Sequence, residues 1–228
     1  MKKAEQIGVI IVAAGLSQRF GKVDKVLALL AGKPVLVHVL EPFIHFPGID
    51  RIILPLNRHN LLPAKKLLAE YGWDRRIITC LGGKRRQDSV YAGFKKLGKC
   101  DWVIIQDGAR PLVTTDLIER GMKAANETGA AIPAVPAKDT IKLADKDGIA
   151  RWTLPRESLY NCQTPQVFRY EVLASAFEYI AQDVTDEAQL VELTGGRVKL
   201  FPGAYDNIKI TAPADLAIAE ALLRSRGD

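Results

Sequence analysis

Short apolar runs rich in valine and isoleucine recur along this chain, and most of them are followed by a stretch with helical spacing. The apolar runs are IGVIIVAA (7–14), RIILPL (51–56), RIITCL (76–81), DWVIIQD (101–107), AAIPAV (130–135) and RVKLFP (197–202). The stretches with helical spacing are 61–72, 86–98, 114–129 and 212–225. Strands that are apolar on both faces and alternate with helices predict a mostly parallel sheet covered on both sides. We therefore expect an α/β, Rossmann-like fold whose ligands bind beyond the carboxyl ends of the strands.

Size and composition indicate one globular domain over residues 1–228. The chain of 228 residues is 48% hydrophobic and 25% charged, so it can bury a sizeable core. Its formal charge of +6 is compatible with phosphorylated ligands, with nucleic acid or with an evenly solvated surface. No run approaches the roughly 20 apolar residues of a membrane helix, and the cysteines form no zinc or disulfide motif. We expect a cytoplasmic protein with no membrane partner.

The alternation breaks between residues 138 and 166, where a hairpin is expected. The turn D-K-D-G (145–148) lies between two segments of β character, TIKLA and IARWTL. We predict that 138–166 forms a β-hairpin arm that projects from the sheet. Because an isolated hairpin is marginally stable in water, we expect the arm to pack on a second subunit of a homodimer.

The loop after the first strand, within VIIVAAGLSQRFGKVDK (9–25), matches neither common phosphate-binding fingerprint. Ser17 stands where a dinucleotide motif G-x-G-x-x-G needs its second glycine. The Walker A motif G-x-x-x-x-G-K-[ST] is not matched either, because five residues separate Gly15 from Gly21 and a valine follows Lys22.

What remains in this loop is a run of small residues followed by cations. Ala13, Ala14 and Gly15 lack bulk, so a base or ribose can approach the main chain closely. Arg19 and Lys25 supply positive charge that can hold a phosphate. The same residues also suit an ordinary strand–loop–helix connection with solvated cations.

Two further loops follow predicted strands and carry polar groups. GGKRRQDSV (82–90) places Gly82 after a strand and Ser89 near a helix start, which suits either ligand binding or a turn with a helix cap. QDGARP (106–111) ends a strand with Asp107, followed by Arg110. An α/β site holds a metal or phosphate at this position, and a loop cap paired with an arginine is the alternative.

Two more candidate cations come late in the chain. Arg156 lies near the return of the arm. Lys209 lies in DNIKIT (206–211), an alternating stretch that we expect to be a strand leading into the last helix. Each of these side chains taken alone also fits a surface position. The occurrence of all these loops in one order is stronger evidence for a ligand site than any single loop.

Together these stretches resemble the 2-C-methyl-D-erythritol 4-phosphate cytidylyltransferase family over nearly the whole chain. The resemblance is carried, in family order, by AAGLSQRF with Lys25, GGKRRQDSV, QDGARP, KDTIK, QTPQVF, TDEA and DNIKITAPADLA. It implies a nucleotidyltransferase that moves CMP from CTP to the acceptor phosphate and releases pyrophosphate. The resemblance distinguishes less well between 2-C-methyl-D-erythritol 4-phosphate and another acceptor, such as ribitol 5-phosphate or another polyol phosphate. A sister enzyme that acts on ribitol 5-phosphate resembles this family in its nucleotide-binding loop.

The resemblance also implies roles at the CTP end of the site. Arg19 and Lys25 would stabilise charge on the α-phosphate during an in-line displacement. Asp107 would lie beside the triphosphate and its Mg²⁺, as a candidate metal ligand. The residues expected to bind the nucleotide are Ala13, Ala14, Gly15, Gly82, Ser89 and Asp107.

At the acceptor end, the resemblance implies that Arg156 and Lys209 are catalytic and position the sugar phosphate, with Thr140 and Arg110 nearby. In the family the arm reaches across a homodimer, so Arg156 is expected to serve the neighbouring subunit's site. The acidic pair of TDEA, Asp186 and Glu187, is expected to support the interface.

One departure from the family pattern leaves the identity of the phosphate-binding lysine open. The family usually has Pro-Lys-Gln where this chain has Asp24-Lys25-Val26, and the loop after Arg19 is one residue short. Lys25 is the better match, and Lys22 is the alternative. We also expect the charge of Asp24 to lower phosphate affinity slightly.

Two rival classes of protein are disfavoured. A nucleic-acid-binding module needs a basic stripe with stacking aromatics, and only 7% of this chain is aromatic. A nicotinamide-dependent oxidoreductase is disfavoured by the missing glycine and by Asn57, which ends the second strand in place of an acid.

Overall fold

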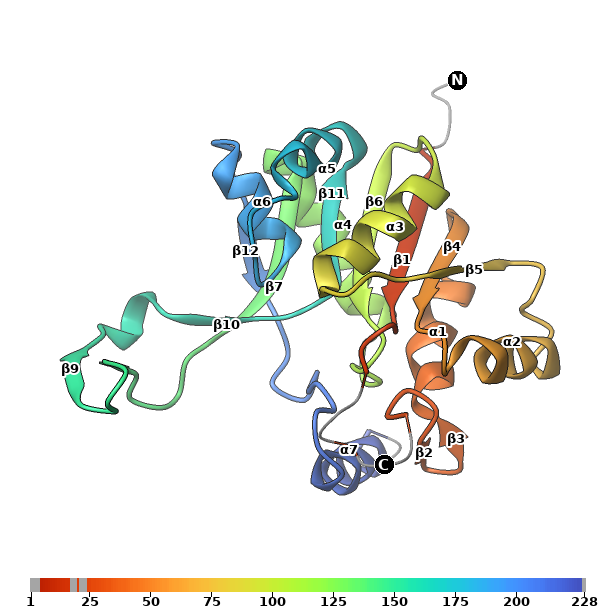
Figure 1. Cartoon of the computed structure of the whole chain (residues 1–228), viewed down its shortest axis with the longest axis horizontal. Coiled ribbons are helices and arrows are strands. Elements are labelled where there is room, and N and C mark those ends of the chain that lie inside the picture. Colours follow the sequence, from red (N-terminus) through yellow and green to blue (C-terminus); the bar gives the residue numbers. More distant parts are fainter. Residues whose placement is uncertain (1–4, 17–19, 21–23, 227–228) are drawn as a thin grey trace.

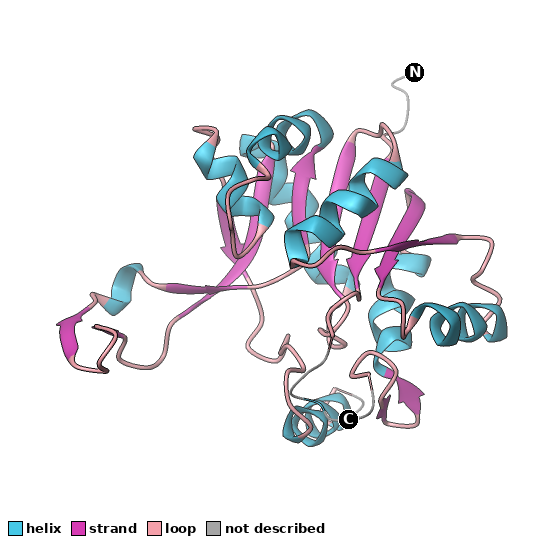
Figure 2. Ribbon diagram, in the orientation of Figure 1, coloured by secondary structure: helices cyan, strands magenta, loops and turns pink. Residues whose placement is uncertain are grey.

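The computed structural model describes residues 5–16, 20 and 24–226. A central sheet carries helices on both faces, and a hairpin arm extends to one side (Figures 1 and 2). The strands are β1 (Ile7–Val12), β2 (Leu29–Leu30), β3 (Lys33–Pro34), β4 (Ile49–Leu56), β5 (Ile77–Leu81), β6 (Trp102–Asp107), β7 (Ala130–Pro136), β8 (Lys142–Ala144), β9 (Ala150–Thr153), β10 (Tyr160–Cys162), β11 (Gln166–Arg169) and β12 (Lys199–Pro202). The α-helices are α1 (Val35–His45), α2 (Leu61–Glu70), α3 (Arg86–Leu97), α4 (Thr115–Thr128), α5 (Tyr170–Ala176), α6 (Glu187–Leu193) and α7 (Ala214–Arg224).

The central sheet is mostly parallel, as the sequence predicts. Strands β5, β4, β1 and β6 lie side by side in that order and run parallel. Strand β11 is antiparallel to both β6 and β7, β10 is antiparallel to β7, and β12 runs parallel to β7. The carboxyl ends of β1, β4, β5 and β6 therefore meet at one edge of the sheet, where α/β proteins bind ligands.

Strand β1 is held in the middle of the sheet by burial on both of its faces. Val9 and Ile11 point into the core beneath α1, α2 and α4, whereas Ile10 points into the core beneath α3, α5 and α6. All three side chains are fully buried. Each contributes about 1.5–3 kcal/mol by its burial, so the loop that follows β1 starts from a rigid base.

Two glycines allow α3 to lie close against β1. A Cβ atom at Gly8 would come within 2.6 Å of the Leu97 side chain, and one at Gly93 within 2.7 Å of Ile10. This close packing places Arg86, the first residue of α3, beside the carboxyl ends of the strands.

The hairpin predicted in the arm is confirmed as β8 and β9, which pair antiparallel apart from the central sheet. Its turn is closed by Asp145, whose Oδ1 accepts hydrogen bonds from the backbone N–H groups of Asp147 and Ile149, each at 3.0 Å. The excursion is shorter than the predicted 138–166, because Tyr160 already pairs with Pro136 of β7 and returns the chain to the sheet.

The predicted strand over 206–211 is wrong. This segment is irregular and crosses the carboxyl ends of the strands, where the N–H of Ile210 donates to the carbonyl of Ala109 at 2.7 Å. The segment then leads into α7, which packs on a third apolar cluster with Leu30 and Ile210. None of the helices in the described part of the chain is long and apolar enough to cross a membrane.

Candidate active site

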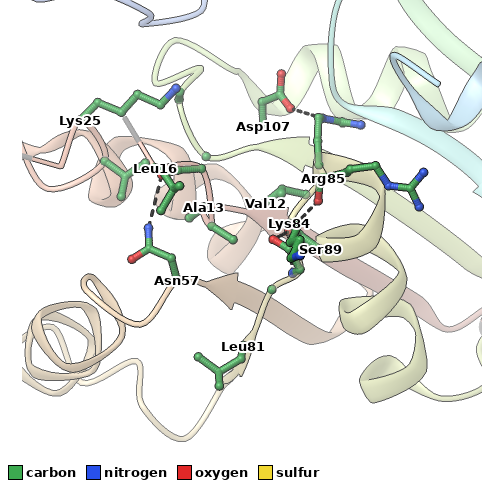
Figure 3. A pocket seen from close by; sticks show the side chains of 18 of the residues that line it. Val12, Ala13, Leu16, Lys25, Asn57, Leu81, Lys84, Arg85, Ser89 and Asp107 are labelled. Atoms are coloured by element: carbon green, nitrogen blue, oxygen red, sulfur yellow. Dashed lines mark hydrogen bonds and ion pairs between the residues drawn. The ribbon is translucent and has the colours of Figure 1, made fainter. Parts of the chain in front are cut away.

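A cavity of about 670 Å³ opens at the carboxyl ends of β1, β4, β5 and β6 (Figure 3). Its volume lies within the range of small-molecule sites, about 300–1,000 Å³. In the view of Figure 3, Lys25 and Asp107 lie toward one end and Leu81 lies at the other. The lining brings together many of the residues singled out from the sequence, namely Ala13, Ala14, Gly15, Lys25, Gly82, Ser89, Asp107 and Lys209.

One wall of the cavity has no room for larger side chains. A Cβ atom at Gly82 would lie 2.4 Å from the Cβ of Ala14 and 2.7 Å from the Oγ of Ser89. The Ser89 hydroxyl in turn accepts a hydrogen bond from the N–H of Gly83 at 3.1 Å. Small residues are therefore required here by packing, and they leave main-chain groups accessible to a flat ligand.

A network of amide groups joins this wall to the segment that carries Lys25. The Nδ2 of Asn60, a buried residue, donates to the carbonyl of Ala13 and to the Oδ2 of Asp24, at 2.8 Å in each case. Asn57 donates to the carbonyl of Gly15 at 3.3 Å and to the same Asp24 oxygen at 3.4 Å. The carboxylate next to Lys25 is thus engaged in holding two walls of the cavity together.

Asp107, the last residue of β6, is surrounded by three cations. Its Oδ1 lies 3.0 Å from the Nε of Arg86, and its Oδ2 lies 2.8 Å from the Nζ of Lys209. The Nε of Arg110 is 3.6 Å from Oδ2. The predicted pairing of Asp107 with Arg110 is present, and the same carboxylate also fixes two cations that line the cavity.

The protonation of this cluster follows from burial and charge together. Burial acts to raise the pKa of Asp107, but the charges of Arg86, Lys209 and Arg110 outweigh it and hold the pKa well below its usual range. Burial lowers the pKa of Arg110, with Asp107 opposing this shift. Asp107 is therefore ionised throughout the neutral range.

We expect the Asp107→Asn variant to be less stable than the wild type, and we expect this difference in stability to decrease as the pH falls. A carboxyl whose native pKa is depressed stabilises the fold above its unfolded pKa, about 3.9, and loses this contribution as the pH falls toward the native value. The difference in the free energy of unfolding, about 3–5 kcal/mol for a broken buried pair, should be constant above about pH 5 and shrink below about pH 4.

Urea unfolding measured across this pH range checks the expectation. Asp116→Asn serves as the control, since that carboxylate is exposed and pairs with Arg120 on the same helix. A difference that grows on acidification would contradict the assigned ion pairs.

Lys209 is held in place by its neighbours in an irregular segment. Asn207, fully buried, donates through Nδ2 to the carbonyl of Thr164 at 2.9 Å, and its own carbonyl accepts from the Nη1 of Arg110 at 2.7 Å. The hydroxyl of Thr164 accepts from the N–H of Asp107 at 3.1 Å. These bonds tie the segment to the ends of β6 and β11.

The structure does not bring Thr140 and Arg156 to the cavity of their own chain. Both line a separate hollow of about 340 Å³ on the arm. The Nη1 of Arg156 donates to the carbonyl of Lys138 at 2.7 Å. Two other predicted cations, Arg19 and Lys22, lie outside the described residues.

The ion pairs that join Asp107 to Arg86 and Arg86 to Glu187 were not anticipated from the sequence. Arg86 lines the cavity and joins Asp107 to Glu187, whose Oε2 lies 2.6 Å from the Nη1 of Arg86. Glu187 is fully buried within the single chain, so its side chain is not presented to a second subunit, and its expected role as interface support stays a prediction. Asp186 instead caps α6 by accepting from the N–H of Gln189 at 3.0 Å.

The family model of 2-C-methyl-D-erythritol 4-phosphate cytidylyltransferase matches residues 7–225 of this chain. The chain belongs to this family. A member from Dehalococcoides mccartyi is 50% identical over 220 residues, which cover 96% of this chain and 97% of the relative. A member from Bacillus licheniformis is 43% identical over 222 residues, covering 95% of each.

Solved structures of the family share the fold. A 4-diphosphocytidyl-2C-methyl-D-erythritol synthase from Anaerococcus prevotii matches with a TM-score of 0.84 at 32% identity, covering 97% of this chain and 100% of that chain. The family member from Thermus thermophilus matches with a TM-score of 0.79 at 31% identity, covering 96% and 99%. The expected α/β fold and the expected family are both confirmed.

Proposed function

We propose that this chain transfers the CMP group of CTP to 2-C-methyl-D-erythritol 4-phosphate and releases pyrophosphate. The observation that carries this proposal is the cavity, which in a member of this family combines a wall of small residues with a cluster of cations. The relatives described above are named for this acceptor, so ribitol 5-phosphate is not favoured.

The reaction is an in-line displacement at phosphorus. An oxygen of the acceptor phosphate forms a bond to the α-phosphorus of CTP, and the bond to the oxygen that bridges to the β-phosphate breaks. The electron pair of that bond leaves with pyrophosphate. No covalent enzyme intermediate is required, so the protein contributes positioning and charge stabilisation.

Within this scheme the small-residue wall holds the cytidine and the cations hold the phosphates. We assign the base and ribose to the wall formed by Ala13, Ala14, Gly15, Gly82 and Ser89. Lys25 and Lys209, which line the same cavity, are assigned to the reacting phosphates. Arg19 remains a prediction for the same role, with Lys22 as the alternative to Lys25.

The carboxylate of Asp107 is the protein group that could hold a Mg²⁺ ion entering with the nucleotide, and it would share its oxygens between the ion and the cations that it pairs with. Asp107 is the acidic side chain among the described residues that line the cavity. The described residues contain no group of three histidine, cysteine or acidic side chains able to hold a metal by themselves. Mg²⁺ is commonly bound through one or two carboxylates plus substrate phosphates, so Asp107 would hold it from the protein side. When bound, the ion would neutralise part of the triphosphate charge.

The arm supports the further proposal of a homodimer. Leu143, Ile149 and Trp152 of the arm are 52%, 57% and 70% exposed in the single chain. A two-stranded hairpin with this much exposed apolar surface is marginally stable by itself. A second subunit would cover it and would bring Arg156 and Thr140 to the neighbouring site.

A pyrophosphate-release assay tests the proposed function. We expect release with CTP and 2-C-methyl-D-erythritol 4-phosphate, and far slower release when ribitol 5-phosphate replaces the acceptor or ATP replaces CTP. Equal or faster release with ribitol 5-phosphate would overturn the assigned acceptor.

A further inference from the structure

Glu187 is a fully buried acid that the mechanism above does not use. It is the first residue of α6 and is 0% exposed. Its Oε2 lies 2.6 Å from the Nη1 of Arg86, while its Oε1 is buried without a hydrogen-bond partner among the described residues. Burial raises the pKa of this carboxyl, although Arg86 opposes the shift.

Arg86 stands between two carboxylates and contacts each with a different nitrogen. Its Nε lies 3.0 Å from the Oδ1 of Asp107, and its Nη1 faces Glu187. A guanidinium presents its donors in a rigid planar fork, so the two contacts together fix the plane and the direction of the group. Lysine offers a point charge on a flexible stem and reproduces only one such contact at a time.

An ion pair at this depth is a poor source of stability, because the cost of removing both charges from water largely offsets their attraction. Its main effect here is on geometry. Without the charge of Glu187, the fork of Arg86 is free to turn and pair with both oxygens of Asp107. It would then compete with Lys209, which lies 2.8 Å from the Oδ2 of Asp107.

We infer that Glu187 is a positioning residue that acts through Arg86 to hold the Asp107 carboxylate and, with it, the Lys209 ammonium in place. This inference rests on the proposed function, because Lys209 matters only if phosphates bind in the cavity. Glu187 is not among the described residues that line the cavity, and its effect passes through the ion pairs of Arg86 with Asp107 and of Asp107 with Lys209.

The Glu187→Gln variant tests the inference, since the amide keeps the size of the side chain and still accepts a hydrogen bond from Arg86. We expect kcat to fall about tenfold or more, as for a lost charge-assisted contact. The stoichiometry of CTP binding, measured by calorimetry, should stay at the wild-type value, because Glu187 is not among the residues that line the cavity. Unchanged stoichiometry shows that the loss is not due to a smaller folded fraction.

A double-mutant cycle with Arg86→Lys then asks whether the effect passes through Arg86. We expect Glu187→Gln to lower kcat by less than about twofold in the Arg86→Lys background, where the two-point contact is already lost. Glu220→Gln is the matched control, because Glu220 forms an exposed pair with Arg224 on α7.

The outcomes separate the inference from the proposed function. A wild-type enzyme that releases no pyrophosphate from the two substrates overturns the proposed function. An active wild type with full kcat in Glu187→Gln, or with equal losses in both backgrounds, overturns the positioning role alone. If Glu187→Gln does not fold, Arg86→Lys replaces it and should lower kcat about tenfold or more, because lysine cannot make both contacts at once. Wild-type kcat in Arg86→Lys would then overturn the positioning role.

Discussion

Replacing Lys209 with alanine is expected to lower kcat/KM by about tenfold to a hundredfold or more, because a hydrogen bond to a charged group is worth about 1.5–3 kcal/mol and each 1.36 kcal/mol is a factor of ten. The Lys209 ammonium lies at the cavity, 2.8 Å from Asp107. Its side chain is 38% exposed, so it is accessible to phosphate oxygens. Steady-state kinetics with both substrates measure the loss.

The fold should survive this substitution, which separates a catalytic loss from unfolding. Asp107 also lies 3.0 Å from Arg86 and 3.6 Å from Arg110, and we expect these contacts to remain when Lys209 is removed, so that no buried charge is left without a partner. We therefore expect a small change in thermal midpoint. Lys199→Ala is the control, because Lys199 pairs with Glu127 on the surface. A Lys209→Ala enzyme with wild-type turnover would remove Lys209 from the reaction.

The parts of the fold that were predicted correctly are those that local sequence patterns determine. Val/Ile-rich runs mark strands buried on both faces, and β1 shows why, since Val9 and Ile10 enter different cores. The hairpin was predictable for a similar reason, because Asp145 and Gly148 form a turn within a few residues of each other.

The segment around Lys209 shows how a local pattern misleads. The alternation of isoleucine with polar residues in 206–211 is typical of a strand, but here Ile210 is buried in the cluster that α7 covers, with Ile208 packed against it. The same alternation therefore arises from packing under a helix, with no neighbouring strand required. Lys209 lines the cavity although its segment is not the predicted strand, and its role in the reaction stays a prediction.

The charged network around Asp107 could not be predicted from sequence patterns, because its members are distant from one another along the chain. Arg86 and Glu187 are 101 positions apart, and no spacing rule links them. The two arginines in GGKRRQ offered a weak signal, and both of them line the cavity. Nothing in the sequence indicated that the carboxylate of Asp24 accepts hydrogen bonds from the amides of Asn57 and Asn60; its expected effect on phosphate affinity stays a prediction.

The position of Arg156 leads to the remaining large prediction, that the site is shared between two subunits. Arg156 lines a hollow on the arm and is absent from the cavity that holds Lys25. If the arm of one subunit completes the site of the other, Lys25→Ala and Arg156→Ala should each lose about tenfold or more in kcat/KM as homodimers. Both losses are measured by pyrophosphate release.

Mixing the two variants distinguishes a shared site from a site within one chain. In a heterodimer, one shared site would combine an intact Lys25 from one subunit with an intact Arg156 from the other, and the second site would lack both. Random exchange makes about half of the dimers heterodimers with one of two sites intact, so activity should recover to about a quarter of the wild-type level. A site built from one chain gives no recovery in purified, differently tagged heterodimers, because each chain then carries one defect in its own site.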